Sequence, residues 1–165
     1  MKVAVLGAGA WGTALGVVLS RNQHHVTLWS RDAAALAALQ TTRRNERHLP
    51  GVELPADWSY EADLARLVRG QDALIVGVAS VGFRSVAARL AGTDAMLISI
   101  TKGIEFDTGL TMGGVLRQCA PGAPVAVLSG PTFAAEVARG MPTAIVAASD
   151  DDEIGRASCR ERVWR

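Results

Sequence analysis

Short apolar runs alternate with amphipathic stretches along most of the chain. The apolar runs are rich in β-branched side chains and predict buried strands, whereas the stretches between them have the apolar spacing of helices. Strands are predicted at Val3–Leu6, His25–Trp29, Ala73–Val78, Ala95–Ile100, Pro124–Leu128 and Thr143–Ala147. Helices are predicted at Trp11–Arg21, Asp32–Thr42, Glu61–Val68, Val81–Leu90, Leu110–Cys119 and Phe133–Arg139. This alternation is typical of βαβ units, so we predict an α/β fold with a doubly wound, mostly parallel sheet.

Two segments interrupt the alternation. Residues Arg43–Ser59 contain Pro50, Gly51 and Pro55 and predict a long irregular stretch, either a functional loop or a solvated connection. The acidic run Asp150–Glu153 predicts a second solvated connection.

The first apolar run has a second interpretation. Lys2 precedes an uncharged run from Val3 to Ser20, as in a signal peptide or a short membrane span. Four glycines divide that run, and its two parts read better as a buried strand followed by a helix. We therefore predict no membrane insertion.

The glycines at the end of the first strand carry the first chemical signal. Gly7, Gly9 and Gly12 have the spacing G-x-G-x-x-G, after a predicted strand and at the start of a predicted helix. In a Rossmann-like fold the first glycine allows the tight turn, the second admits the pyrophosphate, and the third lets helix and strand pack closely. The pattern predicts dinucleotide binding, with a glycine-rich turn that binds nothing as the alternative.

The end of the second strand bears on the choice of dinucleotide. NAD-binding folds usually place a carboxylate there for the ribose 2′-hydroxyl, but this chain has Ser30 followed by Arg31. A guanidinium binds a 2′-phosphate through paired hydrogen bonds, so NADP(H) is favoured and NAD(H) is the second choice. Asp32 is the competing carboxylate, although it is better placed to cap the next helix.

Polar residues also follow the later strands. Lys102 comes after Ala95–Ile100, and Ser129-Gly130-Pro131-Thr132 comes after Pro124–Leu128. Ligands of open α/β sheets bind at the carboxyl ends of the strands, where an ammonium group attracts a phosphate or a carbonyl oxygen. A surface lysine and a simple helix cap are the alternatives.

The composition of the chain limits the classes of protein and of partner that remain. The 165 residues are 49% apolar and 20% charged with a net charge of +1, which suits a globular domain and gives no reason to expect nucleic acid as a partner. Three histidines show no metal-ligand spacing. Cys119 and Cys159 are too few for a disulfide framework.

Five segments in order resemble the bacterial NAD(P)-dependent sn-glycerol-3-phosphate dehydrogenase family from residue 1 to about 149: GAGAWGTALG, LWSR, NERHLPGVELP, SITKGIE and LSGPTFAAEVARGMPTAIVAAS. The resemblance implies a cytoplasmic enzyme that interconverts dihydroxyacetone phosphate and glycerol 3-phosphate for phospholipid synthesis. It implies cofactor contacts at Gly7, Gly9, Ala10, Trp11, Gly12, Arg31, His48, Lys102 and Ala134. It implies substrate contacts at Lys102, Gly130 and Thr132.

The family continues into a helical substrate domain that supplies the catalytic lysine, and we expect that domain to be absent here. We assign residues 1–150 to the cofactor domain and expect it to be inactive alone; in the full-length enzyme it would belong to a homodimer. Residues 151–165 form a basic tail unlike the family, with four arginines among residues 154–165. Foreign sequence is one explanation of this tail and a true extension is the other. Two other functions stay open: a different reductase of a small keto or hydroxy acid, and a non-enzymatic NADP-binding module.

Overall fold

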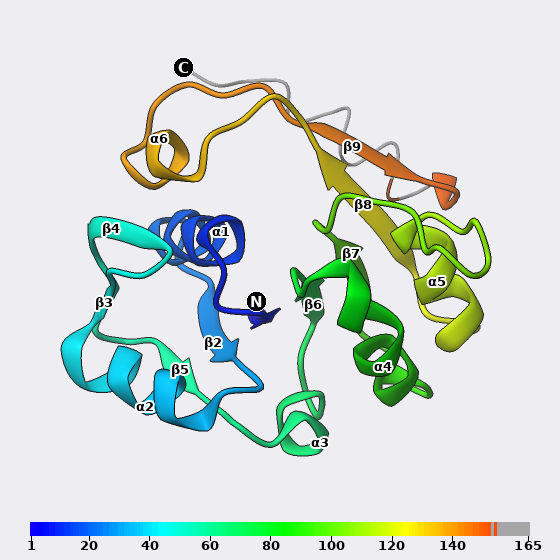
Figure 1. Ribbon diagram of the computed structural model, residues 1–165, viewed down its shortest axis with the longest axis horizontal. Coiled ribbons are helices and arrows are strands. Elements are labelled where there is room, and N and C mark those ends of the chain that lie inside the picture. The colour runs from blue at the N-terminus through cyan, green and yellow to red at the C-terminus, as the bar shows by residue number, and fades with distance from the viewer. Residues whose placement is uncertain (153, 155–165) are drawn as a thin grey trace.

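A seven-stranded sheet forms the centre of the computed structural model, which describes residues 1–152 and 154 (Figure 1). The spatial order is β5-β2-β1-β6-β7-β8-β9, parallel throughout except for β9, which is antiparallel to β8. The strands are β1 Lys2–Leu6, β2 His25–Trp29, β5 Ser59–Tyr60, β6 Ala73–Val76, β7 Met96–Ser99, β8 Val125–Ser129 and β9 Val146–Ser149. The chain runs outward from β1 to β5, then returns and runs outward from β6 to β9. This is the doubly wound order of the predicted fold class.

Helices cover both faces of the sheet (Figure 1). One face carries α1 Ala10–Arg21, α2 Ala33–Thr42 and α6 Ala134–Ala138. The other face carries α3 Leu64–Leu67, α4 Phe83–Ala87 and α5 Met112–Cys119. Single 3-10 turns, η1 Ser80–Gly82 and η2 Ala88–Leu90, extend α4 at its two ends. Among the residues described, no helix is both long and apolar enough to cross a membrane.

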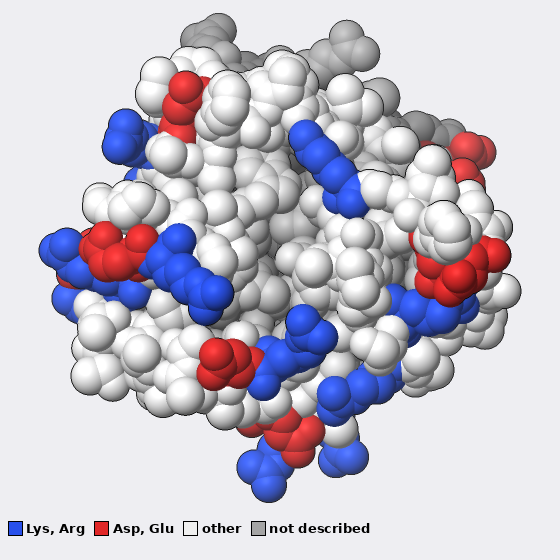
Figure 2. All heavy atoms as spheres, viewed as in Figure 1, with Lys and Arg blue, Asp and Glu red and all other residues white. Residues whose placement is uncertain are grey.

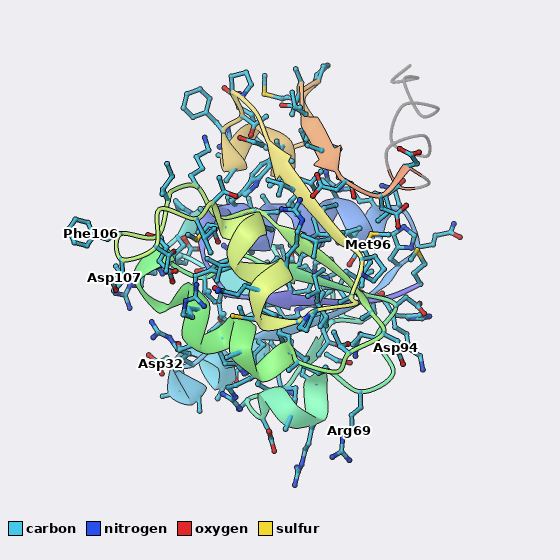
Figure 3. All side chains as sticks on the ribbon, turned by 90° about the vertical axis from the view of Figure 1, so that its right-hand side faces the viewer. Asp32, Arg69, Asp94, Met96, Phe106 and Asp107 are labelled. Atoms are coloured by element: carbon cyan, nitrogen blue, oxygen red, sulfur yellow. The ribbon has the colours of Figure 1, made fainter. Side chains whose placement is uncertain are left out.

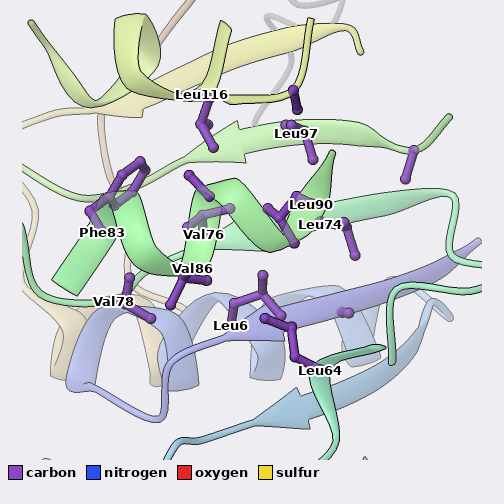
Figure 4. Close-up of a cluster of buried hydrophobic side chains, with 14 of the residues drawn as sticks. Leu6, Leu64, Leu74, Val76, Val78, Phe83, Val86, Leu90, Leu97 and Leu116 are labelled. Atoms are coloured by element: carbon purple, nitrogen blue, oxygen red, sulfur yellow. The ribbon is translucent and has the colours of Figure 1, made fainter. Parts of the chain in front are cut away.

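The core has two layers because the strands bury both of their faces. In β1, Ala4 and Leu6 belong to the layer under α4 and α5, whereas Val3 and Val5 belong to the layer under α1. Figure 4 shows the first layer, in which Phe83 and Val86 of α4, Leu90 of η2 and Leu116 of α5 pack onto the sheet. Continuous burial on both faces explains why the strands read as unbroken apolar runs.

The prediction that Arg43–Ser59 is irregular is wrong. The segment contains an antiparallel hairpin of β3 Arg44–Asn45 and β4 Leu49–Glu53, and its last residue begins β5. Its buried residues, among them Leu49 and Leu54, pack beside α1 and α6. Pro50 and Gly51 hid this pattern because they lie at exposed positions within β4, where strands rarely carry proline or glycine.

Several predicted boundaries are also corrected, mostly at helix caps. The helix predicted over Glu61–Val68 contains only four residues of regular helix, because Asp63 caps it. The helix predicted from Leu110 begins at Met112, because the Thr111 hydroxyl accepts a hydrogen bond from the Gly114 N–H. The last strand lies at Val146–Ser149 instead of Thr143–Ala147.

The acidic run lies partly within the described residues. Its first member, Asp150, forms an ion pair with Arg117 of α5 at 2.6 Å. Glu153, Cys159 and most of the basic tail lie outside the described residues.

Candidate functional site

The order of the strands reverses between β1 and β6, and ligands of this fold class bind at that point, outside the carboxyl ends of the strands. Figure 3 shows both ends of the strands. Asp32 and Phe106 lie on the side of the carboxyl ends, and Asp94 and Met96 lie on the side of the amino ends. Figure 2 looks onto the carboxyl side, where the surface is hollowed and basic side chains stand around the hollow.

At two of the three positions after β1, only glycine fits, because a Cβ would collide with the backbone. Gly7 has a φ of +116°, and a Cβ built there would lie 2.7 Å from the carbonyl oxygen of Gly77, which follows β6. A Cβ on Gly12 would lie 2.7 Å from the carbonyl oxygen of Gly7. Both residues therefore hold α1 and the two neighbouring strands in close contact.

Gly9 differs from them. A Cβ there would meet no atom within 4 Å, and its φ of −72° is open to any residue. The free space lies above the N-terminus of α1, a twelve-residue helix with no side-chain cap. Such a terminus presents unpaired N–H groups and the positive end of the helix dipole, which attract phosphates. Gly9 keeps the approach to that terminus open.

A cleft of about 680 Å³ extends from this turn over the end of β2. The predicted residues Gly7, Gly9, Arg31 and His48 line it. The Arg31 guanidinium reaches toward Gly82, with its Nη1 3.2 Å from the position that a Cβ on Gly82 would occupy, and it forms no ion pair with any described residue.

Asp32 is the helix cap that the sequence predicts. One of its carboxylate oxygens accepts a hydrogen bond from the Ala35 N–H at 2.9 Å at the start of α2. Asp32 also lines the cleft, but that bond gives its carboxylate a role that needs no ribose.

A second hollow of about 310 Å³ lies on the other side of the glycine turn. The remaining predicted residues, apart from Gly12, line it: Ala10, Trp11, Lys102, Gly130, Thr132 and Ala134. The exposed Lys102 forms no ion pair with any described residue. Because Gly9 lines the cleft and Ala10 lines this hollow, the two spaces adjoin at the N-terminus of α1. An extended ligand with phosphates at its centre fits that arrangement.

Gly12 and Gly130 have packing roles. Gly12 is buried beneath the turn and lines neither space. A Cβ on Gly130 would lie 2.6 Å from the carbonyl oxygen of Ala144, so this position requires glycine because the backbone of the segment before β9 lies close to it.

Asn45 is a residue that sequence reasoning missed. It is 3% exposed, and its amide donates hydrogen bonds to the Ala8 carbonyl oxygen and to the Thr13 hydroxyl, both at 2.9 Å. The side chain thereby fixes the glycine turn and α1 to the hairpin that carries His48. In the sequence Asn45 is a single asparagine in a predicted loop, and asparagine is too common in loops to indicate a special role.

Within residues 1–152 and 154, no group of three or more His, Cys, Asp or Glu side chains is arranged to hold a metal ion.

The strand order, the glycine turn at the reversal and the adjoining hollows define a doubly wound domain of the dinucleotide-binding class. The family described as "NAD-dependent glycerol-3-phosphate dehydrogenase N-terminus" matches residues 2–155, and the chain belongs to it. Homologues in this family are NAD(P)-dependent, which agrees with the predicted class of cofactor.

Curated relatives and solved structures agree with this assignment. A glycerol-3-phosphate dehydrogenase [NAD(P)+] of Methylibium petroleiphilum is 46% identical over 158 residues, which cover 93% of this chain and 47% of that protein. One of Halorhodospira halophila is 46% identical over 154 residues, which cover 92% and 46%. The crystal structure of glycerol-3-phosphate dehydrogenase from Coxiella burnetii superposes with a TM-score of 0.89 at 31% identity, over 99% of this chain and 51% of that one. The chain thus spans about half the length of the curated relatives it matches.

Proposed function

We propose that this chain is the cofactor-binding half of an enzyme that reduces dihydroxyacetone phosphate to sn-glycerol 3-phosphate with NAD(P)H. Membership of the family supports the reaction. The coverage of about half of each relative supports the assignment of cofactor binding to this half and of the remaining steps to a second domain. In this proposal residues 1–150 form the dinucleotide domain, and the general acid comes from a second, helical domain that the described residues do not include.

The residues present fit a dinucleotide. The open space at Gly9, the uncapped terminus of α1 and the adjoining hollows support a pyrophosphate at the turn, with one nucleoside in each space. In the proposal Arg31 and His48 bind the adenosine end, and Ala10, Trp11 and Ala134 lie along the nicotinamide end. The bound cofactor supplies the hydride.

Lys102 is the residue of this half that acts nearest the reaction. Its ammonium group shares a hollow with Gly130 and Thr132, so we propose that it attracts the carbonyl oxygen of the substrate and stabilises the negative charge that develops there. The Thr132 hydroxyl and the nearby backbone orient the substrate. A proton must still reach the alkoxide, and we assign that step to the second domain.

We propose a preference for NADP(H) over NAD(H), carried by Arg31. Its guanidinium lines the cleft with no ion pair among the described residues, while the neighbouring carboxylate caps α2. A phosphate on the ribose 2′-oxygen gains charge-assisted hydrogen bonds from a free guanidinium, whereas a hydroxyl gains far less.

A hybrid enzyme tests the reaction. Residues 1–149 are fused to the second half of the Methylibium petroleiphilum relative, and NADPH oxidation is followed with dihydroxyacetone phosphate. We expect turnover by the hybrid, none by the 165-residue chain alone, and a loss of at least about tenfold in kcat/KM on Lys102→Met. Turnover by the chain alone, or full activity of the variant hybrid, contradicts the proposal.

Binding by the chain itself tests the cofactor preference. Titration by nicotinamide fluorescence is expected to give tighter binding of NADPH than of NADH. Arg31→Ala is expected to remove most of that difference, by about tenfold in Kd. Arg69→Ala is the control, because Arg69 lines neither hollow and projects into solvent away from Asp32 (Figure 3). Equal weakening of both cofactors by Arg31→Ala would refute the assignment.

The cytoplasmic location and the homodimer stay predictions from the family resemblance. Sedimentation of the hybrid enzyme at several protein concentrations tests the second of them.

A further inference from the structure

The segment between β7 and α5 carries Lys102, and its start is tied to the sheet. The Ile100 N–H donates to the Val76 carbonyl oxygen at 3.0 Å, and the Thr101 hydroxyl donates to the Val78 carbonyl oxygen at 2.7 Å. After Thr101 the backbone turns at Gly103, whose φ is +127°. The position of Lys102 therefore depends on what holds the segment beyond this turn.

Burial of apolar side chains holds this segment only at its far end, where the partly buried Leu110 packs against the core. Ile104 is 65% exposed and Phe106 is 98% exposed, and Figure 3 shows Phe106 projecting away from the body of the domain. A loop with so few buried apolar anchors opens at low cost unless polar contacts fix it.

Backbone hydrogen bonds close the segment on itself, with the Glu105 N–H donating to the Leu110 carbonyl oxygen at 2.8 Å, and an ion pair ties it to α4. The Nε and Nη2 of Arg84, on α4, donate to the two carboxylate oxygens of Glu105 at 2.7 and 2.6 Å. This is the paired fork geometry in which a guanidinium and a carboxylate bind most strongly. The Glu105 side chain is only 16% exposed, so the pair is partly shielded from water.

Further bonds connect the pair to both neighbouring elements. The Thr108 hydroxyl donates to Glu105 at 2.6 Å, which closes the tip of the segment on itself. The Nη2 of Arg84 also donates to the Gln118 side-chain oxygen on α5 at 2.7 Å. Bonds from Arg84 and Thr108 lower the pKa of the Glu105 carboxyl to about 2, so it stays ionised at neutral pH. The Arg84 guanidinium thus joins α4 to the Lys102 segment through Glu105 and to α5 through Gln118.

We propose that Arg84 and Glu105 are positioning residues for Lys102: their paired hydrogen bonds hold the segment after β7 in the conformation that places the Lys102 ammonium in the hollow beside Gly130 and Thr132. This inference rests on the proposed contact of Lys102 with cofactor and substrate. It assigns to α4, which lines neither hollow, a role in ligand affinity.

A double-mutant cycle on the 165-residue chain tests the proposal, with NADPH affinity as the readout. Arg84→Lys keeps the positive charge but removes the fork, and Glu105→Gln keeps the shape but removes the carboxylate. Each is expected to weaken NADPH by about fivefold in the parent and by less than about twofold in a Lys102→Met background, because the effect passes through Lys102.

Arg117→Lys is the matched control. Arg117 is 42% exposed, close to the 37% of Arg84, and its ion pair with Asp150 has the same 2.6 Å length, but its only ion pair among the described residues is with Asp150, outside the Lys102 segment. It is expected to leave NADPH affinity unchanged in both backgrounds.

Amide hydrogen exchange without cofactor provides a second readout. Residues 102–110 are expected to exchange at least about tenfold faster in Arg84→Lys and Glu105→Gln than in the parent, with β1 and β6 unchanged. Thermal unfolding identifies a variant that fails to fold, and the other variant then carries the test.

The outcomes separate the two proposals. If Lys102→Met leaves NADPH affinity unchanged, the proposed contact of Lys102 with the cofactor is wrong. If Lys102→Met weakens binding but the Arg84 and Glu105 variants do not, or weaken it equally in both backgrounds, the positioning role is wrong and the pair serves stability alone.

Discussion

Gly7→Ala and Gly9→Ala add the same methyl group to neighbouring parts of one turn, yet we expect only Gly7→Ala to destabilise the fold. At Gly7 the new Cβ would lie 2.7 Å from a backbone oxygen and 2.9 Å from its carbon, neither of which moves easily. The overlap costs about 1–3 kcal/mol, and the φ of +116° adds roughly 1–3 kcal/mol for a residue other than glycine. Together these terms amount to about 2–6 kcal/mol, and we expect a loss of about 3 kcal/mol, in the lower half of that range.

Gly9→Ala meets neither penalty. Its Cβ would have free space and its backbone angles suit alanine, so stability should change by no more than about 0.5 kcal/mol. In the proposed complex the same methyl group lies between the backbone and the pyrophosphate. We expect NADPH affinity to fall by about tenfold or more, which corresponds to about 1.4 kcal/mol.

Thermal unfolding and NADPH titration of the two variants test these expectations. For a domain of this size about 1 kcal/mol shifts Tm by roughly 2–4 °C, so Gly7→Ala should lower Tm by about 6–12 °C and Gly9→Ala by less than about 2 °C. If Gly9→Ala binds NADPH as the parent does, the phosphates do not cross the turn at Gly9. If Gly7→Ala unfolds at the parent temperature, the close approach of β1 and β6 is not required.

Three further predictions concern single polar side chains. Asn45→Ala removes the donor to the Ala8 carbonyl and the Thr13 hydroxyl, and at about 1–3 kcal/mol for a buried group left unpaired, urea denaturation should show a loss of about 2 kcal/mol or more. Asp32→Ala should cost about 1 kcal/mol through the lost cap of α2, whereas Asp32→Asn keeps a capping side chain and should stay within about 0.5 kcal/mol in the same assay. Glu105 has its pKa lowered to about 2 by Arg84 and Thr108, so its stabilising contribution is complete above the ordinary carboxyl pKa and is lost as pH falls toward 2. Chemical denaturation between about pH 6 and pH 2 should therefore give a steeper loss of stability for the parent than for Glu105→Gln, and parallel curves would contradict this reasoning.

The inner strands β1, β2, β6, β7 and β8 could be predicted from the sequence, because burial on both faces leaves a run of apolar residues that is visible locally; β5 was missed and β9 was predicted three residues too early. Val3 to Leu6 is apolar at every position, and each of those side chains is 3% exposed or less. The glycine spacing was equally informative, because two of its three glycines have no room for a side chain. Both signals are local, so one sequence is sufficient to detect them.

The β3–β4 hairpin could not be predicted in this way. Its strands are short, Pro50 and Gly51 lie within β4, and its buried residues pack against α1 and α6, which are distant in the sequence. Tertiary packing overrides local preference in such segments. The hairpin nevertheless forms one wall of the cleft, so the part of the site that recognises the adenosine end in our proposal was the part least visible in the sequence.

The loops around the site share one construction principle. Asn45 fixes the glycine turn, Thr101 fixes the start of the Lys102 segment, and Glu105 fixes its far end, each through hydrogen bonds between parts of the chain far apart in sequence. A loop that must stay open to a ligand cannot be held by apolar burial on its ligand side, so a few polar side chains have to supply the rigidity from behind. The residues that contact the ligand in our proposal could be found from their place after a strand, but the residues that hold them have no such signal in the sequence. Substituting Asn45 or Glu105 should therefore change ligand affinity as well as stability, although neither is among the residues that the family resemblance marks as contacts.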